Sequence, residues 1–263
     1  MIQSPNPQSL NYIHPEAQLG ANVSVGPFST ISENVVIGEG TWIGPHVTIL
    51  PGARIGSYCQ IFPGAVISAI PQDLKFQGED STVEIGDYTT IREHVTISRG
   101  TLAGPVTRIG SHVLLMAYVH VAHDCKIGDH AILANTVQLA GHVEIDAHVK
   151  IGGMAALRQF VKVGAHAMIT GGSLVRKDIP PFIKVAREPI RYCGLNIVGL
   201  NRHGFTIQQI QTIQLIYSYI FQQGLPLSVA LLQIEEAIMP CPEKELVLDF
   251  IKKSELGIVK NQL

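Results

Sequence analysis

Large aromatic side chains are scarce in this sequence. They make up 6% of the 263 residues, with a single tryptophan, although 46% of the chain is hydrophobic. The apolar content therefore comes mainly from Ile, Val, Leu and Ala. Such a composition favours many short, tightly packed strands over a core built on a few aromatic clusters.

Signals for export or membrane insertion are also missing. The sequence contains no run of about 18 apolar residues. Its first ten residues carry neither a basic segment nor an apolar one. We therefore expect a cytoplasmic protein without stable membrane insertion.

Cysteine is present but unpaired by spacing. The sequence has no CxxC or similar motif, so neither a disulfide framework nor a structural zinc knuckle is indicated. The simplest interpretation is four free thiols, on Cys59, Cys125, Cys193 and Cys241.

An excess of charge of one sign occurs only locally. The whole chain has a net charge of -2, which gives no basis for nucleic acid binding. Residues 147–202, however, hold nine Lys and Arg against two Asp and Glu, so this segment carries +7 and the remainder -9. This asymmetry suggests an acidic partner or ligand, and a solvated basic face is the alternative.

An aliphatic residue recurs every six positions. The pattern runs unbroken from Ile13 to Ile67, returns from Ile85 to Ile97, and continues from Ile109 to Val175, commonly with a small residue or valine four positions later. Three such hexapeptides, each a short strand and a turn, close a triangular coil of 18 residues with the aliphatic side chains stacked inside. The pattern predicts an all-β fold, the left-handed parallel β-helix.

Two segments interrupt the repeat, near residues 68–82 and 102–108, and we expect both to be loops expelled from the coil. Beyond Val175 the sequence R-K-D-I-P-P-F indicates a linker, and from about residue 191 the apolar periodicity is helical. Thr206 with Gln209 forms a capping-box pattern, and Pro242 can begin a last helix. The predicted domains are a β-helix over residues 1–190 and a C-terminal α-helical domain over residues 191–263.

The stretch Y-V-H-V-A-H-D-C, residues 118–125, concentrates chemically active side chains. Residues 18 apart occupy equivalent positions on successive coils, about 4.8 Å apart, which places His123, Gly141 and Gln159 in one column. Cys125 falls at the small inward position and should be buried and inert. We expect the other three polar residues of this region, His120, Asp124 and His142, to border His123 on a common surface.

This combination favours acyl transfer. An imidazole next to a carboxylate can act as a general base, and a glycine amide on the next coil can stabilise an oxyanion. As a turn residue, His123 is expected to be exposed. One alternative is a zinc enzyme like the γ-class carbonic anhydrases, which also use β-helices, although zinc needs three or four convergent ligands. A purely structural solenoid would need neither the loops nor the histidines.

Nine segments resemble one known family over essentially the full chain, the UDP-N-acetylglucosamine acyltransferases of lipid A biosynthesis. The segments are P-Q-D-L-K (71–75), V-E-I-G-D (83–87), I-R-E-H-V-T-I-S-R-G-T (91–101), H-V-A-H-D-C (120–125), I-L-A-N (132–135), L-A-G-H-V (139–143), I-G-G-M (151–154), R-Q-F (158–160) and G-L-N-I-V-G-L-N-R-H-G-F (194–205). The related N-acyltransferases carry an extra N-terminal uridine-binding domain, for which there is no room before Ile13.

The resemblance implies that His123 removes the proton of the sugar 3-hydroxyl, which attacks the thioester of a 3-hydroxyacyl carrier protein. Asp124 would orient His123, and the Gly141 amide would form the oxyanion hole. The implied substrate-binding residues are Asp73, Lys75, His120, His142, Gln159, Asn196 and Arg202. The family further implies a homotrimer with active sites between adjacent subunits, an acidic acyl carrier protein as donor, and no metal or other cofactor.

The resemblance also assigns acyl-chain length to Gly171. This glycine lies 48 residues beyond His123, or about 13 Å along the axis at ~4.8 Å per coil. A glycine leaves that path open, so we expect a chain of about 14 carbons, longer than one of about 10, to fit over this distance.

Three positions depart from the commoner pattern of the family. Ser98 stands where His is usual, Val198 where Glu is usual, and His203 where a second Arg is usual. The last two border the implied nucleotide site, so the sequence leaves open whether the sugar is N-acetylglucosamine or its 3-amino analogue.

Overall fold

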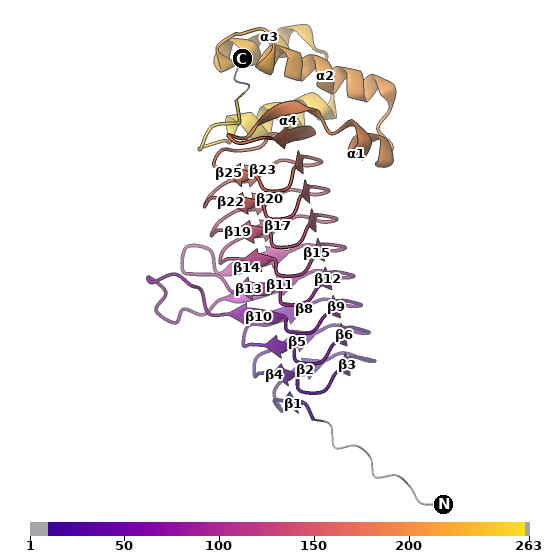
Figure 1. Cartoon of the computed structure of the whole chain (residues 1–263), viewed down its shortest axis with the longest axis vertical. Coiled ribbons are helices and arrows are strands. Elements are labelled where there is room, and N and C mark those ends of the chain that lie inside the picture. Colours follow the sequence, from indigo (N-terminus) through magenta and orange to yellow (C-terminus); the bar gives the residue numbers. More distant parts are fainter. Residues whose placement is uncertain (1–9, 261–263) are drawn as a thin grey trace, which may run out of the picture.

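The computed structural model describes residues 10–260, in which short strands wind into a tall β-helix covered at its C-terminal end by helices (Figure 1). The ends of the two predicted domains and the N-terminal segment examined for an export signal lie partly outside these residues. Three sheets form the three sides of the β-helix, and from β1 to β26 the neighbouring strands of each sheet pair in parallel. The predicted fold class is confirmed.

Each coil contributes one strand to each sheet. The first sheet consists of β1 (Tyr12–Ile13), β4 (Thr30–Ile31), β7 (Thr48–Ile49), β10 (Val66–Ala69), β13 (Thr96–Ser98), β16 (His120–Val121), β19 (Gln138–Leu139), β22 (Ala156–Leu157) and β25 (Leu174–Val175). The second consists of β2 (Gln18–Leu19), β5 (Val36–Ile37), β8 (Ala53–Ile55), β11 (Thr82–Ile85), β14 (Val106–Ile109), β17 (Lys126–Ile127), β20 (Glu144–Ile145) and β23 (Lys162–Val163). The third consists of β3 (Ser24–Val25), β6 (Trp42–Ile43), β9 (Gln60–Ile61), β12 (Thr90–Ile91), β15 (Leu114–Leu115), β18 (Ile132–Leu133), β21 (Lys150–Ile151), β24 (Met168–Ile169), β26 (Ile183–Ala186) and β27 (Arg191–Leu195).

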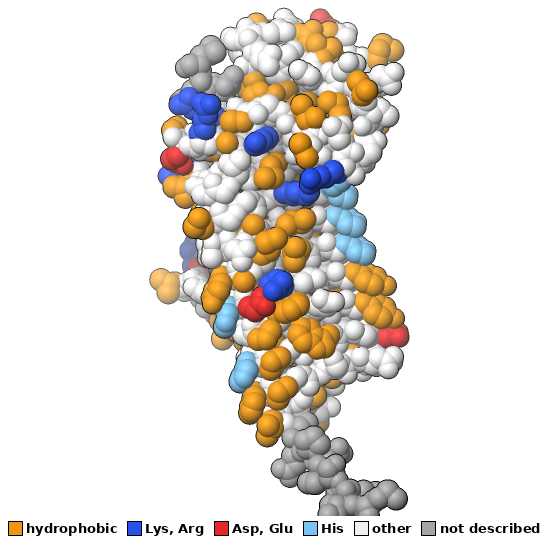
Figure 2. Space-filling model, turned by 45° about the vertical axis from the view of Figure 1, so that its right-hand side comes forward, with side chains coloured by type: hydrophobic (Ala, Val, Ile, Leu, Met, Phe, Trp, Pro, Cys, Tyr) orange, Lys and Arg blue, Asp and Glu red, His pale blue; other side chains and the backbone are white. Residues whose placement is uncertain are grey.

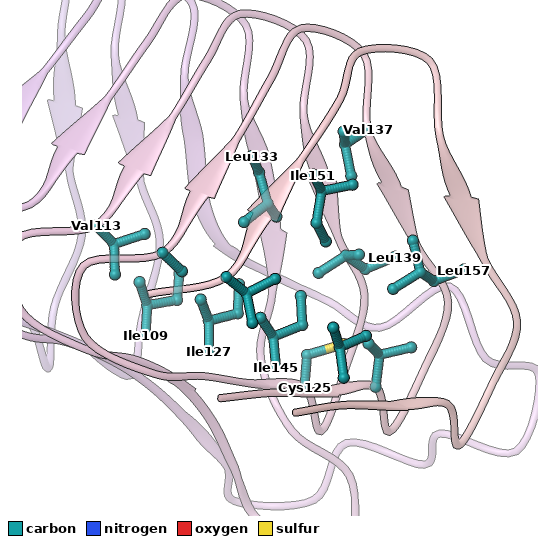
Figure 3. Close-up of a cluster of buried hydrophobic side chains, with 14 of the residues drawn as sticks. Ile109, Val113, Cys125, Ile127, Leu133, Val137, Leu139, Ile145, Ile151 and Leu157 are labelled. Carbon is teal, nitrogen blue, oxygen red and sulfur yellow. The ribbon is translucent and has the colours of Figure 1, made fainter. Parts of the chain in front are cut away.

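The aliphatic residue of each hexapeptide points into the coil. From Ile31 to Val175 every residue at this position is at most 4% exposed. Figure 3 shows Ile109, Ile127 and Ile145 in a row, side by side on successive coils. Because strands two residues long bury little on their own, this continuous apolar stack holds the coils together.

The turns repeat as regularly as the strands. In most turns the third residue after the aliphatic residue has a positive φ, which most side chains adopt only under constraint. Along the corner between the second and third sheets this position carries four stacked imidazoles, which we call the histidine ladder: His112, His130, His148 and His166, with ring centroids 4.7–4.8 Å apart. Burial, with the neighbouring His148 and His203, lowers the pKa of His166 to about 4. None of these four histidines was singled out from the sequence, and the stack was missed.

Both expelled loops leave from the corner between the first and second sheets. The first spans residues 70–81, between β10 and β11, as expected. The second spans residues 99–105, between β13 and β14, and so begins about three residues earlier in the chain than the sequence suggested. The two loops touch, because the Arg99 guanidinium lies over the Phe76 ring, 5.3 Å from its centroid.

The third sheet continues past residue 190, because β27 pairs antiparallel with β26. Four helices follow: α1 (Ile197–Arg202), α2 (Ile207–Phe221), α3 (Leu227–Ala237) and α4 (Pro242–Lys252). The capping box of Thr206 and Gln209 at α2 is confirmed. Within residues 10–260, none of the helices is long and apolar enough to cross a membrane.

Asp178 joins the helices to the last coil. This carboxylate is fully buried and accepts hydrogen bonds from the Lys162 backbone N–H (2.8 Å) and the Ser254 hydroxyl (2.6 Å). Its own backbone pairs with Gly257 and Val259. The C-terminal region is therefore fixed to the β-helix by charge-assisted hydrogen bonds.

Candidate active site

His123 and Asp124 occupy the turn between β16 and β17, at the corner between the first and second sheets. Both expelled loops leave from this same corner, one and two coils earlier. The regular coil therefore places the base predicted from the sequence at the same corner as the two segments that interrupt the repeat.

His123 and Asp124 form a buried pair. The Nδ1 of His123 lies 2.7 Å from Oδ2 of Asp124, and the residues are 6% and 5% exposed. A carboxylate at Nδ1 fixes the tautomer in which Nδ1 carries the proton, which leaves the Nε2 lone pair free to accept another. The expectation of an exposed turn histidine was wrong, because the second loop and the next coil cover this turn.

Thr101 and Thr107 hold the carboxylate in place. The Thr101 N–H donates to Oδ1 of Asp124 (2.7 Å) and its hydroxyl to Oδ2 (2.8 Å). The Thr107 hydroxyl accepts from the Asp124 N–H (2.9 Å). Sequence reasoning assigned no role to either threonine. Through Thr101 the second loop closes over the His123–Asp124 pair, which explains why the repeat is interrupted here.

Gly141 lies directly above the imidazole. A Cβ at this position would come within 2.5 Å of Cε1 of His123, so only glycine allows the ring to pack there. Among residues 10–260 no hydrogen bond to the Gly141 N–H is present. The amide is therefore available to an acceptor outside the chain.

His142, His120 and Gln159 surround the pair. The Nε2 of His142 lies 3.3 Å from Oδ2 of Asp124, and its ring stacks on Phe160 with centroids 4.6 Å apart. The Nδ1 of His120 lies 2.7 Å from the Thr96 hydroxyl, and burial, with the positive charge that His123 can carry, lowers the pKa of His120. Gln159 is exposed on the following coil.

The same corner has three groups that a metal ion could use, because ligand atoms of His123, Asp124 and His142 lie within 4.8 Å of one another. The Asp124 carboxylate, however, already accepts hydrogen bonds from His123 and Thr101. These bonds would have to be exchanged for a metal ligand. The geometry therefore favours a hydrogen-bonded base over a zinc centre at this corner.

Asn196 and Arg202 lie on a different side of the molecule. Asn196 caps α1 and donates from Nδ2 to the His166 carbonyl (2.9 Å). Together with Lys150, Lys184 and Val198 the two residues line a hollow of about 310 Å³ on the third sheet. In a triangular coil this sheet is opposite the corner that carries His123. One chain alone therefore cannot bring both the residues of this hollow and His123 to the same ligand. Lys150 and Lys184 belong to the basic segment noted above, but no motif singled them out.

The remaining predicted residues are spread over two corners. Asp73 and Lys75 lie on the first loop, where the Lys75 N–H donates to Oδ1 of Asp73 (3.0 Å). Gly171 is exposed in the turn between β24 and β25, at the corner of the third and first sheets. Gly171 and His123 therefore lie on different sides of one chain, and the axial separation of about 13 Å expected from the sequence is not the length of a path along one face. Ser98, the first departure from the family pattern, is buried beside the second loop, at 2% exposure.

Comparison with protein-family models matched two parts of the chain. Residues 178–259 match the model described as UDP-N-acetylglucosamine O-acyltransferase, domain 2. Residues 34–69 and 107–141 match the model of bacterial transferase hexapeptides. The two matches correspond to the helical end and to the repeat of the β-helix.

Similar proteins cover nearly the whole chain. An acyl-[acyl-carrier-protein]–UDP-N-acetylglucosamine O-acyltransferase from Sulfurihydrogenibium sp. is 58% identical over 94% of this chain and 93% of its own. The corresponding protein from Paracidovorax citrulli is 47% identical over 94% and 97%. Among solved structures, a UDP-N-acetylglucosamine acyltransferase from Bacteroides fragilis is 50% identical, with a TM-score of 0.94 over 97% of this chain and 99% of its own. The resemblance carried by the sequence motifs is confirmed.

Cys125, next to the His123–Asp124 pair, is buried, and this burial raises the pKa of its thiol to about 12. We therefore predict that iodoacetamide at neutral pH alkylates the exposed Cys193 of the native protein and leaves Cys125 unmodified until the chain is unfolded. Peptide mass spectrometry measures both rates in one sample. Alkylation of native Cys125 as fast as Cys193 would contradict a buried, inert thiol.

Proposed function

The chain belongs to the family of UDP-N-acetylglucosamine O-acyltransferases, and we propose that His123 is the general base of this reaction. The reaction transfers a 3-hydroxyacyl chain from acyl carrier protein to the 3-oxygen of UDP-N-acetylglucosamine, the first step of lipid A biosynthesis. The observation that carries the proposal is the buried His123–Asp124 pair below the free amide of Gly141. Membership in this family selects acyl transfer over the zinc-enzyme alternative.

The geometry supports a simple sequence of proton transfers. Nε2 of His123 takes the proton of the sugar 3-hydroxyl as its oxygen attacks the thioester carbon, and Asp124 stabilises the imidazolium that forms. The Gly141 N–H donates to the oxyanion. Collapse of this intermediate breaks the carbon–sulfur bond, and His123 returns the proton to the departing thiolate. His120, His142 and Gln159, around the pair, would bind the substrate.

A 3-amino sugar nucleotide is the second candidate acceptor. The amine attacks as a neutral nucleophile and loses its proton afterwards, which the same base can accept. Val198 is 63% exposed beside Arg202 in the hollow on the third sheet, where the commoner family pattern has a glutamate. No described contact favours the 3-amino sugar, so N-acetylglucosamine is retained as the acceptor.

We propose that the active enzyme is a homotrimer with each active site between two subunits. Asn196 and Arg202, with Lys150 and Lys184, form a basic hollow suited to a pyrophosphate. This hollow is on the side opposite His123, so the base of one subunit must meet the nucleotide hollow of its neighbour. Asp73 and Lys75, on a loop that leaves from the His123 corner, would reach across such a boundary.

The acyl donor and the site of action follow the same reasoning. The basic segment from Lys150 to Arg202 forms the last coils of the β-helix, the end of the third sheet and α1. An acidic acyl carrier protein can dock on these positive charges. Acyl carrier protein and a UDP-sugar are soluble substrates, in agreement with the cytoplasmic location expected from the sequence, which remains a prediction.

Replacement of His123 by alanine tests the base. We predict that His123→Ala lowers the rate of acyl transfer by about 10²–10⁴-fold or more, because proton transfer in the transition state is lost. Since His123 is buried, circular dichroism and the oligomeric state must be unchanged for the result to count. His112→Ala, a histidine of the ladder at a similar turn, is the matched control and should retain activity. A folded His123→Ala enzyme within tenfold of the unmodified rate would refute the assignment.

Mixed oligomers test the shared site. His123→Ala and Arg202→Ala, each nearly inactive alone, should regain activity when co-expressed with different tags and purified as mixed trimers. Random mixing leaves about a quarter of the boundaries with both residues intact, so we predict about that fraction of the unmodified activity. No gain above the separate variants would mean that both residues serve the same subunit.

Enlargement of Gly171 tests the acyl-chain limit. We predict that Gly171→Met shifts the preferred donor from about 14 carbons to a shorter chain, because the methionine side chain fills the space that the exposed glycine leaves open at this turn. Gly171→Ala is the matched control, since its Cβ makes the same close contact with the Gly153 carbonyl oxygen but does not extend into the space for the acyl chain. Rates with acyl carrier proteins of graded chain length measure the shift. An unchanged preference in Gly171→Met would remove Gly171 from the acyl site.

A further inference from the structure

The upper end of the histidine ladder meets a further histidine from the helical region. His203 follows the last residue of α1, and its Nδ1 lies 3.0 Å from Nδ1 of His166. Its ring centroid is 4.5 Å from that of His148 and 5.1 Å from that of His166. Figure 2 shows histidine side chains stacked in a column below a group of Lys and Arg side chains. Three imidazoles from three separate turns therefore converge at one point.

The donor atoms of these histidines are close enough for one ion. One ring nitrogen each of His148, His166 and His203 lies within 4.8 Å of the others. Zinc with imidazole ligands at about 2.1 Å in tetrahedral geometry separates the nitrogens by about 3.4 Å. The His166–His203 pair is already closer than this, and rotation of the side chains brings His148 nearer.

The contact between His166 and His203 requires one lone pair and one N–H, since two N–H groups would repel each other. A metal ion can take the place of that shared proton.

The backbone of each histidine is held independently of the side chains. The His166 carbonyl accepts from Asn196, and the His203 N–H donates to the carbonyls of Gly199 and Leu200. The His148 N–H donates to the Asp129 carbonyl, one coil below. Only side-chain rotations are needed for binding, so the ordering cost is small.

The charges around the cluster act in both directions. Burial and then the Lys150 ammonium lower the pKa of His203, so Lys150 opposes a bound cation. The Asp129 carboxylate acts on His148 in the opposite sense and therefore favours a cation. His203 is exposed, which leaves a fourth coordination position open to water.

We propose that His148, His166 and His203 form a binding site for a divalent transition-metal ion such as Zn²⁺, which ties α1 to the histidine ladder. The site is separate from the His123 corner and does not depend on the proposed catalytic roles. The helix that it fixes carries Arg202, so a bound ion would immobilise one wall of the basic hollow on the third sheet.

Metal titration of the full-length protein tests the site. The protein is stripped with EDTA and dialysed, Zn²⁺ is added, and bound zinc is counted by elemental mass spectrometry alongside calorimetry. We expect one ion per chain, and at least about a tenfold weaker affinity in His203→Ala, because one of three ligands is lost. Co²⁺ should give visible absorption bands in the unmodified protein that His203→Ala removes.

Two matched variants locate the ion. His112→Ala lies in the same ladder but outside the cluster and should bind zinc like the unmodified protein. His123→Ala removes a ligand from the other candidate group, formed with Asp124 and His142, and should also leave zinc binding unchanged. Equal zinc binding in His203→Ala and the unmodified protein would overturn the proposal, as would a loss caused by His123→Ala instead. A Kd above about 1 mM for Zn²⁺ and Co²⁺ would reduce the cluster to a hydrogen-bonded stack.

Discussion

The register between successive coils is the constraint on which the rest of the structure depends. Strands of two to five residues cannot persist alone, so each coil is stable only while its aliphatic side chains stack on those above and below. Parallel pairing at 18-residue spacing, as between His120 and Gln138 in the first sheet, keeps every side chain in a column. The register therefore fixes the positions of all residues along one corner relative to one another.

The active-site corner shows what this register permits and what it cannot supply. The register brings Gly141 above His123, where the absence of a Cβ lets the ring approach the backbone. It cannot supply a partner that closes over the base, because each coil already pairs with its neighbours. The second expelled loop provides one, and Thr101 reaches Asp124 from it with two hydrogen bonds. Burial in turn strengthens the interaction between His123 and Asp124.

Much of the fold and the centre of the site could be predicted from the sequence, because both follow from a fixed period. The six-residue repeat predicts the coil, and an 18-residue step predicts that His123 and Gly141 meet. The burial of His123, the role of Thr101 and the convergence of His203 with His166 could not be predicted in this way. These contacts join the coil to segments outside the repeat, whose path is set by loop conformation and packing. The position of Arg202 opposite His123 could not be predicted either, because Arg202 lies in α1, beyond the repeat that assigns residues to sides of the coil.

Identification of the reaction product tests the central account most directly. The purified protein is incubated with UDP-N-acetylglucosamine and 3-hydroxyacyl carrier proteins of graded chain length, and the product is analysed by mass spectrometry before and after mild alkali. A base at His123 acting on a sugar hydroxyl predicts a UDP-sugar bearing one 3-hydroxyacyl group, of about 14 carbons given the open path over Gly171, in an alkali-labile ester. An alkali-stable amide formed only from a 3-amino sugar, or no acylated product with any carrier protein, would contradict the account.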